Sequence, residues 1–181
     1  ANVHTEVFTL GDNAYPSGSA RDYARCFTWG DSTKSIMGKI HPAPGNHDHQ
    51  AGGAAPYYRY FGNNAGPAGK GYYSYDVGAW HVIALNSEIA VNGAFSNTDR
   101  KAQEDWLRED VASNRHKCTL AYWHHPRFSS GSHGSDPRMA PFWRILHDGG
   151  ADLVLNGHDH DYERFLPQTP EAVLDSTTGM T

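Results

Sequence analysis

A layered α/β or α+β domain is the fold class that the sequence predicts, because short β-prone runs alternate with helical stretches along the chain. The 181 residues fit one domain, residues 1–181, which can bury a core without help from a disulfide or a metal. Aromatic residues make up 12% of the chain, which favours a packed globular protein over a disordered one. Polar clusters follow several of the strand-like runs, where a layered sheet gathers its functional groups.

The strand-like runs are recognised by their apolar, β-branched and aromatic residues. The first run ends abruptly at Gly11-Asp12, and two later runs are joined at Val77-Gly78-Ala79, a hairpin signal. We expect strands at residues 7–10, 39–43, 72–76, 80–85, 118–123 and 152–155.

The helices are recognised by apolar spacing and by their start and stop signals. The first is capped by Ser17 or Ser19 and followed by Gly30, and the last stops at Gly149-Gly150. We expect helices at residues 19–29, 98–111 and 137–147, a long ordered loop at residues 50–71, and a weakly patterned end at residues 167–181.

Composition excludes some classes of function. The net charge is −5 and the basic residues are scattered, so no nucleic-acid partner is expected. No apolar stretch approaches the roughly 18 residues of a membrane span. The two cysteines allow either one disulfide or two thiols, and Cys118 lies in an apolar run that suggests a core position. A start at Ala1, shortly before a strand, indicates a processed protein or a fragment.

Histidine is the compositional outlier, with twelve residues that cluster beside Asp and Asn. Imidazole is the commonest metal ligand in proteins, so the clusters suggest a metal site. Four loops carry them: Gly11-Asp12-Asn13-Ala14-Tyr15, Gly45-Asn46-His47-Asp48, His124-His125-Pro126 and Gly157-His158-Asp159-His160.

Each loop has an ordinary structural interpretation when it is taken alone. Asp12 could form a turn, Tyr15 could be a core aromatic, and His124 could be a buried, hydrogen-bonded histidine. Two histidines at i and i+2, as in His158-x-His160, are harder to explain without a metal. Four loops that place metal-binding side chains near strand ends are unexpected by chance.

The donor types agree with one another. Carboxylate, amide oxygen, imidazole and phenolate suit first-row divalent and trivalent metals, and no thiolate is needed. One carboxylate with several histidines can hold two metals if the carboxylate bridges them. Two such metals can clamp a phosphate ester and lower the pKa of a bound water, so that a metal-bound hydroxide becomes the nucleophile.

The four blocks, in this order, resemble those of the calcineurin-like metallophosphoesterases. Tyr15, four residues after Gly11, narrows the resemblance to the purple acid phosphatase branch. The resemblance implies a two-sheet β-sandwich core flanked by helices. It also implies an Fe(III) ion with a divalent zinc, iron or manganese ion, and a small phosphorylated substrate.

The resemblance also implies a role for each matching residue. Asp12 would bridge the metals, and Tyr15 and His160 would bind the first metal. His124 is preferred over His125 because the family ligand lies two residues before the proline. The second metal would be bound by Asn46, His124 and His158.

Three further residues would act on the substrate. His47, with Asn46, would contact the phosphate, with Asp48 orienting the His47 ring. Either His133 or His47 would assist the leaving group as a catalytic residue, with His133 placed to protonate it. His133 could instead be an ordinary loop histidine in a Gly/Ser stretch. Arg164 could bind substrate, support the site from behind or form a surface ion pair. His49, His116 and His125 are expected to be structural or solvent-facing, although His125 could line the pocket.

One family block, a strand ending in Asp-x-Gly, has no counterpart here, and the last strands of the second sheet are also missing. The chain is therefore expected to be truncated at both ends, with a first metal site that is weak or empty. An open sheet edge would favour self-association. Relatives of this character are exported, which predicts a secreted or periplasmic protein.

Three functions remain in competition. The leading hypothesis is hydrolysis of phosphate monoesters, and the second is phosphodiester cleavage on the same metals. The third is a non-catalytic metal-binding fragment or an inactive relative, which the absent Asp-x-Gly block would favour.

Overall fold

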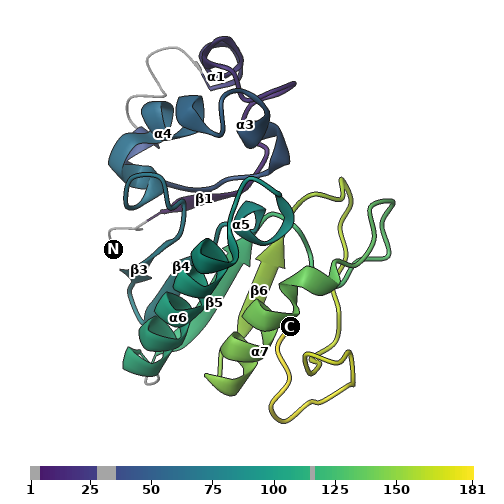
Figure 1. Ribbon diagram of the computed structural model, residues 1–181. Coiled ribbons are helices and arrows are strands. Elements are labelled where there is room, and N and C mark those ends of the chain that lie inside the picture. Colours follow the sequence, from purple (N-terminus) through teal and green to yellow (C-terminus); the bar gives the residue numbers. More distant parts are fainter. Residues whose placement is uncertain (1–4, 28–35, 115–116) are drawn as a thin grey trace.

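Two β-sheets pack face to face in the computed structural model, which describes residues 5–27, 36–114 and 117–181 (Figure 1). The first sheet pairs β1 (Val7–Leu10) in parallel with β2 (Ile40–Ala43). The second sheet has the order β3-β4-β5-β6, antiparallel between β3 and β4 and parallel from there on. Its strands are β3 (Tyr73–Val77), β4 (Trp80–Ala84), β5 (Cys118–Trp123) and β6 (Leu153–Asn156).

Helices cover the outer faces of both sheets (Figure 1). The first sheet is covered by α1 and α4, whose buried aromatic residues pack with Ile40 of β2. The second sheet is covered by α6 and α7 through Leu107 and Leu146. The helices are α1 (Ala20–Cys26), α3 (Asn46–Gln50), α4 (Ala55–Phe61), α5 (Glu88–Val91), α6 (Asn97–Ser113) and α7 (Ala140–Asp148), with 3₁₀ turns at Met37–Lys39, Gly62–Ala65 and Pro137–Met139.

The side chains of β5 point alternately to the first sheet and to the helices, which explains the layered packing. Successive side chains of a strand point to opposite faces. Tyr122 packs between the two sheets with Val82 and Phe8, whereas Ala121 and Trp123 face the helices. The predicted layered fold with a two-sheet core is therefore confirmed.

The prediction of a loop at residues 50–71 is wrong. Helix α4 occupies its centre, with Pro56 in its first turn and Tyr57 and Phe61 buried one turn apart. The spacing of this pair is the sequence signal for a helix. The helix has only seven residues and is flanked by Gly and Asn, so the signal was not recognised. The first helix begins at Ser19, which forms a capping box with Asp22, and it ends at Cys26. Phe27, predicted to be helical, is the C-cap, and the rest of the predicted helix to Trp29 and the stop at Gly30 lie outside the described residues.

The core position predicted for Cys118 is also wrong, because this residue is exposed at the start of β5. Cys26 and Cys118 are both free thiols in the structure. Within the described residues, no helix is both long and apolar enough to cross a membrane.

Strand β6 lies at the edge of the second sheet. The C-terminal segment covers part of this edge, because the backbone N–H of Val154 donates to the carbonyl of Thr181, 2.8 Å away. Self-association through a sheet edge stays a prediction.

The topology brings four strand ends together. Strands β1 and β2 run parallel, as do β5 and β6, so the carboxyl ends of each pair meet at one edge of their sheet. The four metal-binding loops leave from these ends, two from each sheet, and they converge between the sheets.

Candidate metal centre

Asp12 lies where the four loops meet. Its Oδ2 atom is 3.0 Å from the Tyr15 hydroxyl and 3.3 Å from His124 Nε2. Its Oδ1 atom accepts a hydrogen bond of 2.9 Å from the backbone N–H of His47. Burial alone would raise the pKa of Asp12, but hydrogen bonding and charge from His124, with a smaller contribution from His47, outweigh it and lower the pKa to about 2.

On one side of Asp12 the structure assembles three donors, the first-metal set (Asp12, Tyr15 and His160). The Tyr15 hydroxyl is 3.1 Å from His160 Nε2 and 3.0 Å from Asp12 Oδ2. These separations suit neighbouring ligands of one metal ion at about 2.0–2.2 Å. Burial and the negative charge of Asp12 raise the pKa of Tyr15 to about 12.

On the other side lies the second-metal set (Asp12, Asn46, His124 and His158). His124 Nε2 is 2.9 Å from Asn46 Oδ1 and 3.1 Å from His158 Nδ1. The other ring nitrogen of His124, Nδ1, donates to the carbonyl of Leu10 at 2.7 Å. Nε2 therefore faces an amide oxygen, a carboxylate oxygen and an imidazole nitrogen at once.

The three groups around His124 Nε2 show whether a metal ion suits this position. All three groups around His124 Nε2 can act as acceptors, and a single proton on Nε2 cannot satisfy all of them. A divalent cation can, because each group then becomes a ligand. The carbonyl of Leu10 also fixes the tautomer, as partners behind a metal-bound histidine do. The donor set therefore fits the metal that the sequence predicts.

Backbone strain marks the same place. Asp12 and His158 both lie in the left-handed region, with φ of 51° and 72°. Such conformations cost about 1–3 kcal/mol for a non-glycine residue and cluster at functional sites. Two predicted ligands thus have conformations that the surrounding structure must enforce.

Two glycines allow the loops to approach the ligands. A Cβ atom on Gly11 would lie 2.4 Å from His124 Nδ1, and one on Gly45 would lie 2.4 Å from Asp12 Oδ1. The glycines that open the first two blocks are therefore required by close packing.

Asp48 ties the first two loops together and does not orient the His47 ring as predicted. Its buried carboxylate accepts hydrogen bonds from the backbone N–H groups of Asn13 and Gly45 and from the Tyr23 hydroxyl. His47 Nδ1 instead contacts the Pro16 carbonyl, and Nε2 faces Asp12 Oδ2 at 3.9 Å. The His47 ring therefore lies beside the first-metal set.

His133 lies at the second-metal set, as its predicted role requires. Its ring is 4.3 Å from that of His158, centroid to centroid, and its Nδ1 is 2.9 Å from Asp159 Oδ1. A cavity of about 300 Å³ opens between His125, His133, His158 and Arg138. Sequence reasoning missed Asp159. An acidic residue between two metal-binding histidines was the available signal.

His125 is buried beside the predicted ligands and lines the cavity, which agrees with the structural and pocket-lining alternatives and not with the solvent-facing one. One ring nitrogen each of His124, His125 and His158 lie within 4.8 Å of one another. However, His125 Nδ1 is 2.9 Å from Ser87 Oγ, and Nε2 faces Glu88 Oε1 at 3.6 Å. We therefore place His125 behind the donors.

The remaining histidines and Arg164 lie elsewhere. His49 is buried, in agreement with a structural role, and His116 lies outside the described residues. Arg164 is exposed and lines a cavity beside β6. The described lining of that cavity includes Asp159 but none of the predicted metal ligands, so substrate binding by Arg164 stays a prediction.

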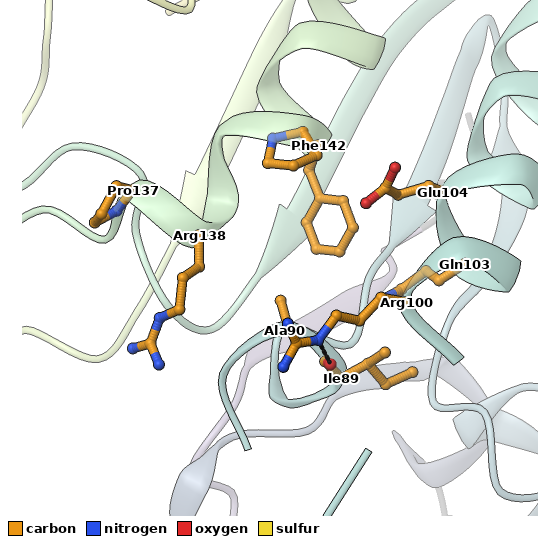
Figure 2. A pocket seen from close by; sticks show the side chains of 9 residues that line it. Ile89, Ala90, Arg100, Gln103, Glu104, Pro137, Arg138 and Phe142 are labelled. Carbon is orange, nitrogen blue, oxygen red and sulfur yellow. Dashed lines mark hydrogen bonds between the residues drawn. The ribbon is translucent and has the colours of Figure 1, made fainter. Parts of the chain in front are cut away.

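A separate pocket of about 230 Å³ lies between α5, α6 and α7, where Arg100 donates to the Ile89 carbonyl at 3.2 Å (Figure 2). Its described lining contains Arg138 but none of the predicted metal ligands. We therefore exclude it as the metal centre.

The geometry agrees with the comparison to known proteins. Residues 3–162 match the family model of the calcineurin-like phosphoesterases. The chain belongs to this family. The predicted family is thus confirmed, and the relatives agree with the predicted branch.

Purple acid phosphatase 15 of Arabidopsis thaliana is 31% identical over 109 residues, which is 56% of this chain and 19% of that protein. An uncharacterized protein of Mycobacterium tuberculosis is 29% identical over 193 aligned residues, which is 93% of this chain and 36% of that protein. The chain therefore spans only a fifth to about a third of these curated relatives.

A purple acid phosphatase from yellow lupin seeds shares the fold, with a TM-score of 0.68 at 19% identity, over 91% of this chain and 32% of that one. GAP50, the anchor in the inner membrane complex of Plasmodium, does so with a TM-score of 0.65 at 11% identity, over 95% of this chain and 65% of that one. These two likenesses concern the fold. Location outside the cytoplasm stays a prediction.

Proposed function

We propose that the chain carries a two-metal centre for the hydrolysis of phosphate monoesters. One observation carries the proposal: Asp12 Oδ2 belongs to both donor sets, 3.0 Å from Tyr15 on one side and 3.3 Å from His124 on the other. A carboxylate in this position can bridge two ions. Bound there, the ions would neutralise phosphate charge and lower the pKa of a water that serves as nucleophile.

The side chains around the donor sets suggest how a substrate would be handled. His47 and Asn46 lie on either side of Asp12, where the phosphoryl oxygens would be held. His133 lies on the side of the cavity. As the bond from phosphorus to the leaving oxygen breaks, its electron pair stays on that oxygen. The oxygen then takes a proton from His133 Nε2, which keeps the N–H electron pair.

Monoesters are favoured over diesters by two features. The cavity beside the second-metal set has a volume of about 300 Å³, which favours a phosphate that carries one ester group over one that carries two. The chain has a net charge of −5, which disfavours polyanionic diesters such as nucleic acids. The name of the relative from Arabidopsis thaliana, purple acid phosphatase 15, supports the same choice.

We expect the metal-loaded protein to hydrolyse p-nitrophenyl phosphate with a kcat/KM at least about tenfold above that for bis(p-nitrophenyl) phosphate, a difference of about 1.4 kcal/mol. Steady-state release of p-nitrophenol, measured with one protein preparation, gives both values. A reversed ratio would support a phosphodiesterase. No rate with either substrate, while metal analysis shows bound ions, would support a non-catalytic relative.

We also expect the two donor sets to differ in affinity. The second-metal set has four donors, and among the described residues the first-metal set has three, with Tyr15 40% exposed. A zinc titration followed by calorimetry should show one tight and one weak equivalent per chain. Two tight equivalents would contradict this prediction.

The weak step should strengthen as the pH rises, because the pKa of Tyr15 is raised to about 12 and its proton must leave when the phenolate binds metal. With Fe(III), occupation of this set should produce a tyrosinate charge-transfer band in the visible spectrum. The identity of the metals is part of the proposal.

A further inference from the structure

We propose that Asp159 is the positioning residue for His133, holding the ring by Nδ1 so that Nε2 is directed at the leaving group. The inference rests on the proposed function and deepens it. Asp159 Oδ1 is 2.9 Å from His133 Nδ1, and it accepts the backbone N–H of the same residue at 2.8 Å. One carboxylate oxygen thus fixes both the backbone and the ring of His133.

The carboxylate of Asp159 is itself firmly held. Its side chain is only 4% exposed, whereas that of His133 is 53% exposed. Its Oδ2 atom accepts the Ser129 hydroxyl at 2.5 Å. Both oxygens of this carboxylate therefore act as acceptors on a buried support.

The loop that carries His133 is folded around this carboxylate. A Cβ atom on Gly131 would lie 2.4 Å from the carboxylate carbon of Asp159, so only glycine fits beside it. Ser129 Oγ, which donates to Asp159, also accepts the backbone N–H of Gly131 at 2.9 Å. The Gly/Ser stretch, residues 129–134, therefore folds around Asp159, the acid that contacts His133.

A second acid holds the same loop without touching His133. The carboxylate of Glu163 accepts the backbone N–H of Ser130 at 3.0 Å and also the Ser130 hydroxyl. Glu163 thus serves as a matched control, because its loss should loosen the loop but leave the hydrogen bond between Asp159 and His133 intact.

The contact decides which ring nitrogen faces the substrate. Asp159 Oδ1 accepts the backbone N–H of His133, and Oδ2 accepts the Ser129 hydroxyl, so both oxygens act as acceptors and His133 Nδ1 supplies the hydrogen of the contact between Oδ1 and the ring. The other nitrogen, Nε2, is left for the cavity, which His133 lines together with the predicted metal ligand His158. In the doubly protonated ring Nε2 carries the second hydrogen, and this is the proton that passes to the leaving oxygen. Because Asp159 lies between His158 and His160 in the sequence, the block that supplies two metal ligands also sets the position of the proton donor.

Asp159→Asn tests the proposal on two substrates with different leaving groups. p-Nitrophenolate leaves without help, whereas the alkoxide of glycerol 2-phosphate needs a proton. General acid catalysis contributes about 10²–10⁴-fold. We therefore expect kcat for glycerol 2-phosphate to fall at least about 30-fold and kcat for p-nitrophenyl phosphate to fall no more than about threefold. Glu163→Gln should change both rates by the same factor.

Two results would overturn the inference while the proposed function stands. One is an equal loss on both substrates in Asp159→Asn, and the other is an undiminished effect of Asp159→Asn in a His133→Ala background. A wild-type protein that hydrolyses neither substrate would instead remove the proposed function. If Asp159→Asn does not fold, a long-range ¹H–¹⁵N spectrum of the zinc-loaded wild type decides. It should show a hydrogen on His133 Nδ1, both in the neutral ring and in the doubly protonated ring that acts as the acid. A neutral ring with its hydrogen on Nε2 would refute the proposal.

Discussion

Replacing His124 with alanine should remove metal binding and hydrolysis together. His124 Nε2 lies within 3.3 Å of a donor atom of every other member of the second-metal set, at 2.9 Å from Asn46, 3.1 Å from His158 and 3.3 Å from Asp12. Its loss leaves a buried gap where a cation would be shared. We expect the hydrolysis of p-nitrophenyl phosphate to fall by more than the roughly 10–100-fold that is typical when a residue behind a metal ligand is lost.

His147→Gln provides the matched control for His124→Ala. His147 lies at the end of α7, its side chain is 19% exposed, and its nearest ionic neighbour is Asp148. This variant should keep full metal content and rate. Metal analysis and the chromogenic assay, run on both variants, check the prediction. A His124→Ala protein that retains both zinc and rate would remove His124 from the ligands.

Gly11→Ala should have the second large effect, on stability and metal affinity at once. Gly11 has φ of +90°, a conformation that costs an L-residue about 1–3 kcal/mol. The added Cβ would also lie 2.4 Å from His124 Nδ1, the atom that donates to the Leu10 carbonyl. The ring must therefore move, and the donors around Nε2 separate.

Gly78→Ala separates the cost of backbone strain from the cost of the clash between the added Cβ and a neighbouring side chain. Gly78 has φ of +60°, but no atom lies within 4 Å of its added Cβ. This control should lose about 1–2 kcal/mol of unfolding free energy from backbone strain and keep its zinc affinity. Urea denaturation and zinc titration of both variants give the comparison. Equal losses in the two, with zinc affinity unchanged, would contradict the packing argument at Gly11.

Most of the candidate site was predictable from the sequence, and the physical reason is local. Each block pairs a strand with the turn that follows it, so Asp12 after β1 and His124 after β5 are placed by a few neighbouring residues. Parallel pairing within each sheet then brings the strand ends together. The convergence of the four loops could therefore be expected from the strand ends, whereas the ligand role of each residue came from the family resemblance.

The supporting contacts could not be predicted in the same way. His133 and Asp159 are separated by 26 residues, and their hydrogen bond depends on how a loop closes around Gly131. Asp48 was expected to act on its neighbour His47, but it reaches Asn13 instead, 35 residues away. Helix α4 was missed because its signal is only two turns long, and tertiary packing of Tyr57 and Phe61 stabilises it.

Each donor set draws on both sheets. Asp12, Tyr15 and Asn46 follow strands of the first sheet, whereas His124, His158 and His160 follow strands of the second. An ion bound in either set would therefore cross-link the two sheets, and metal binding would be coupled to the packing of one sheet on the other. By mass action, an ion at 100 times its dissociation constant would add about 2.7 kcal/mol to the free energy of unfolding. A chelator would then weaken the contact between the sheets as well as remove the ions from the proposed metal centre.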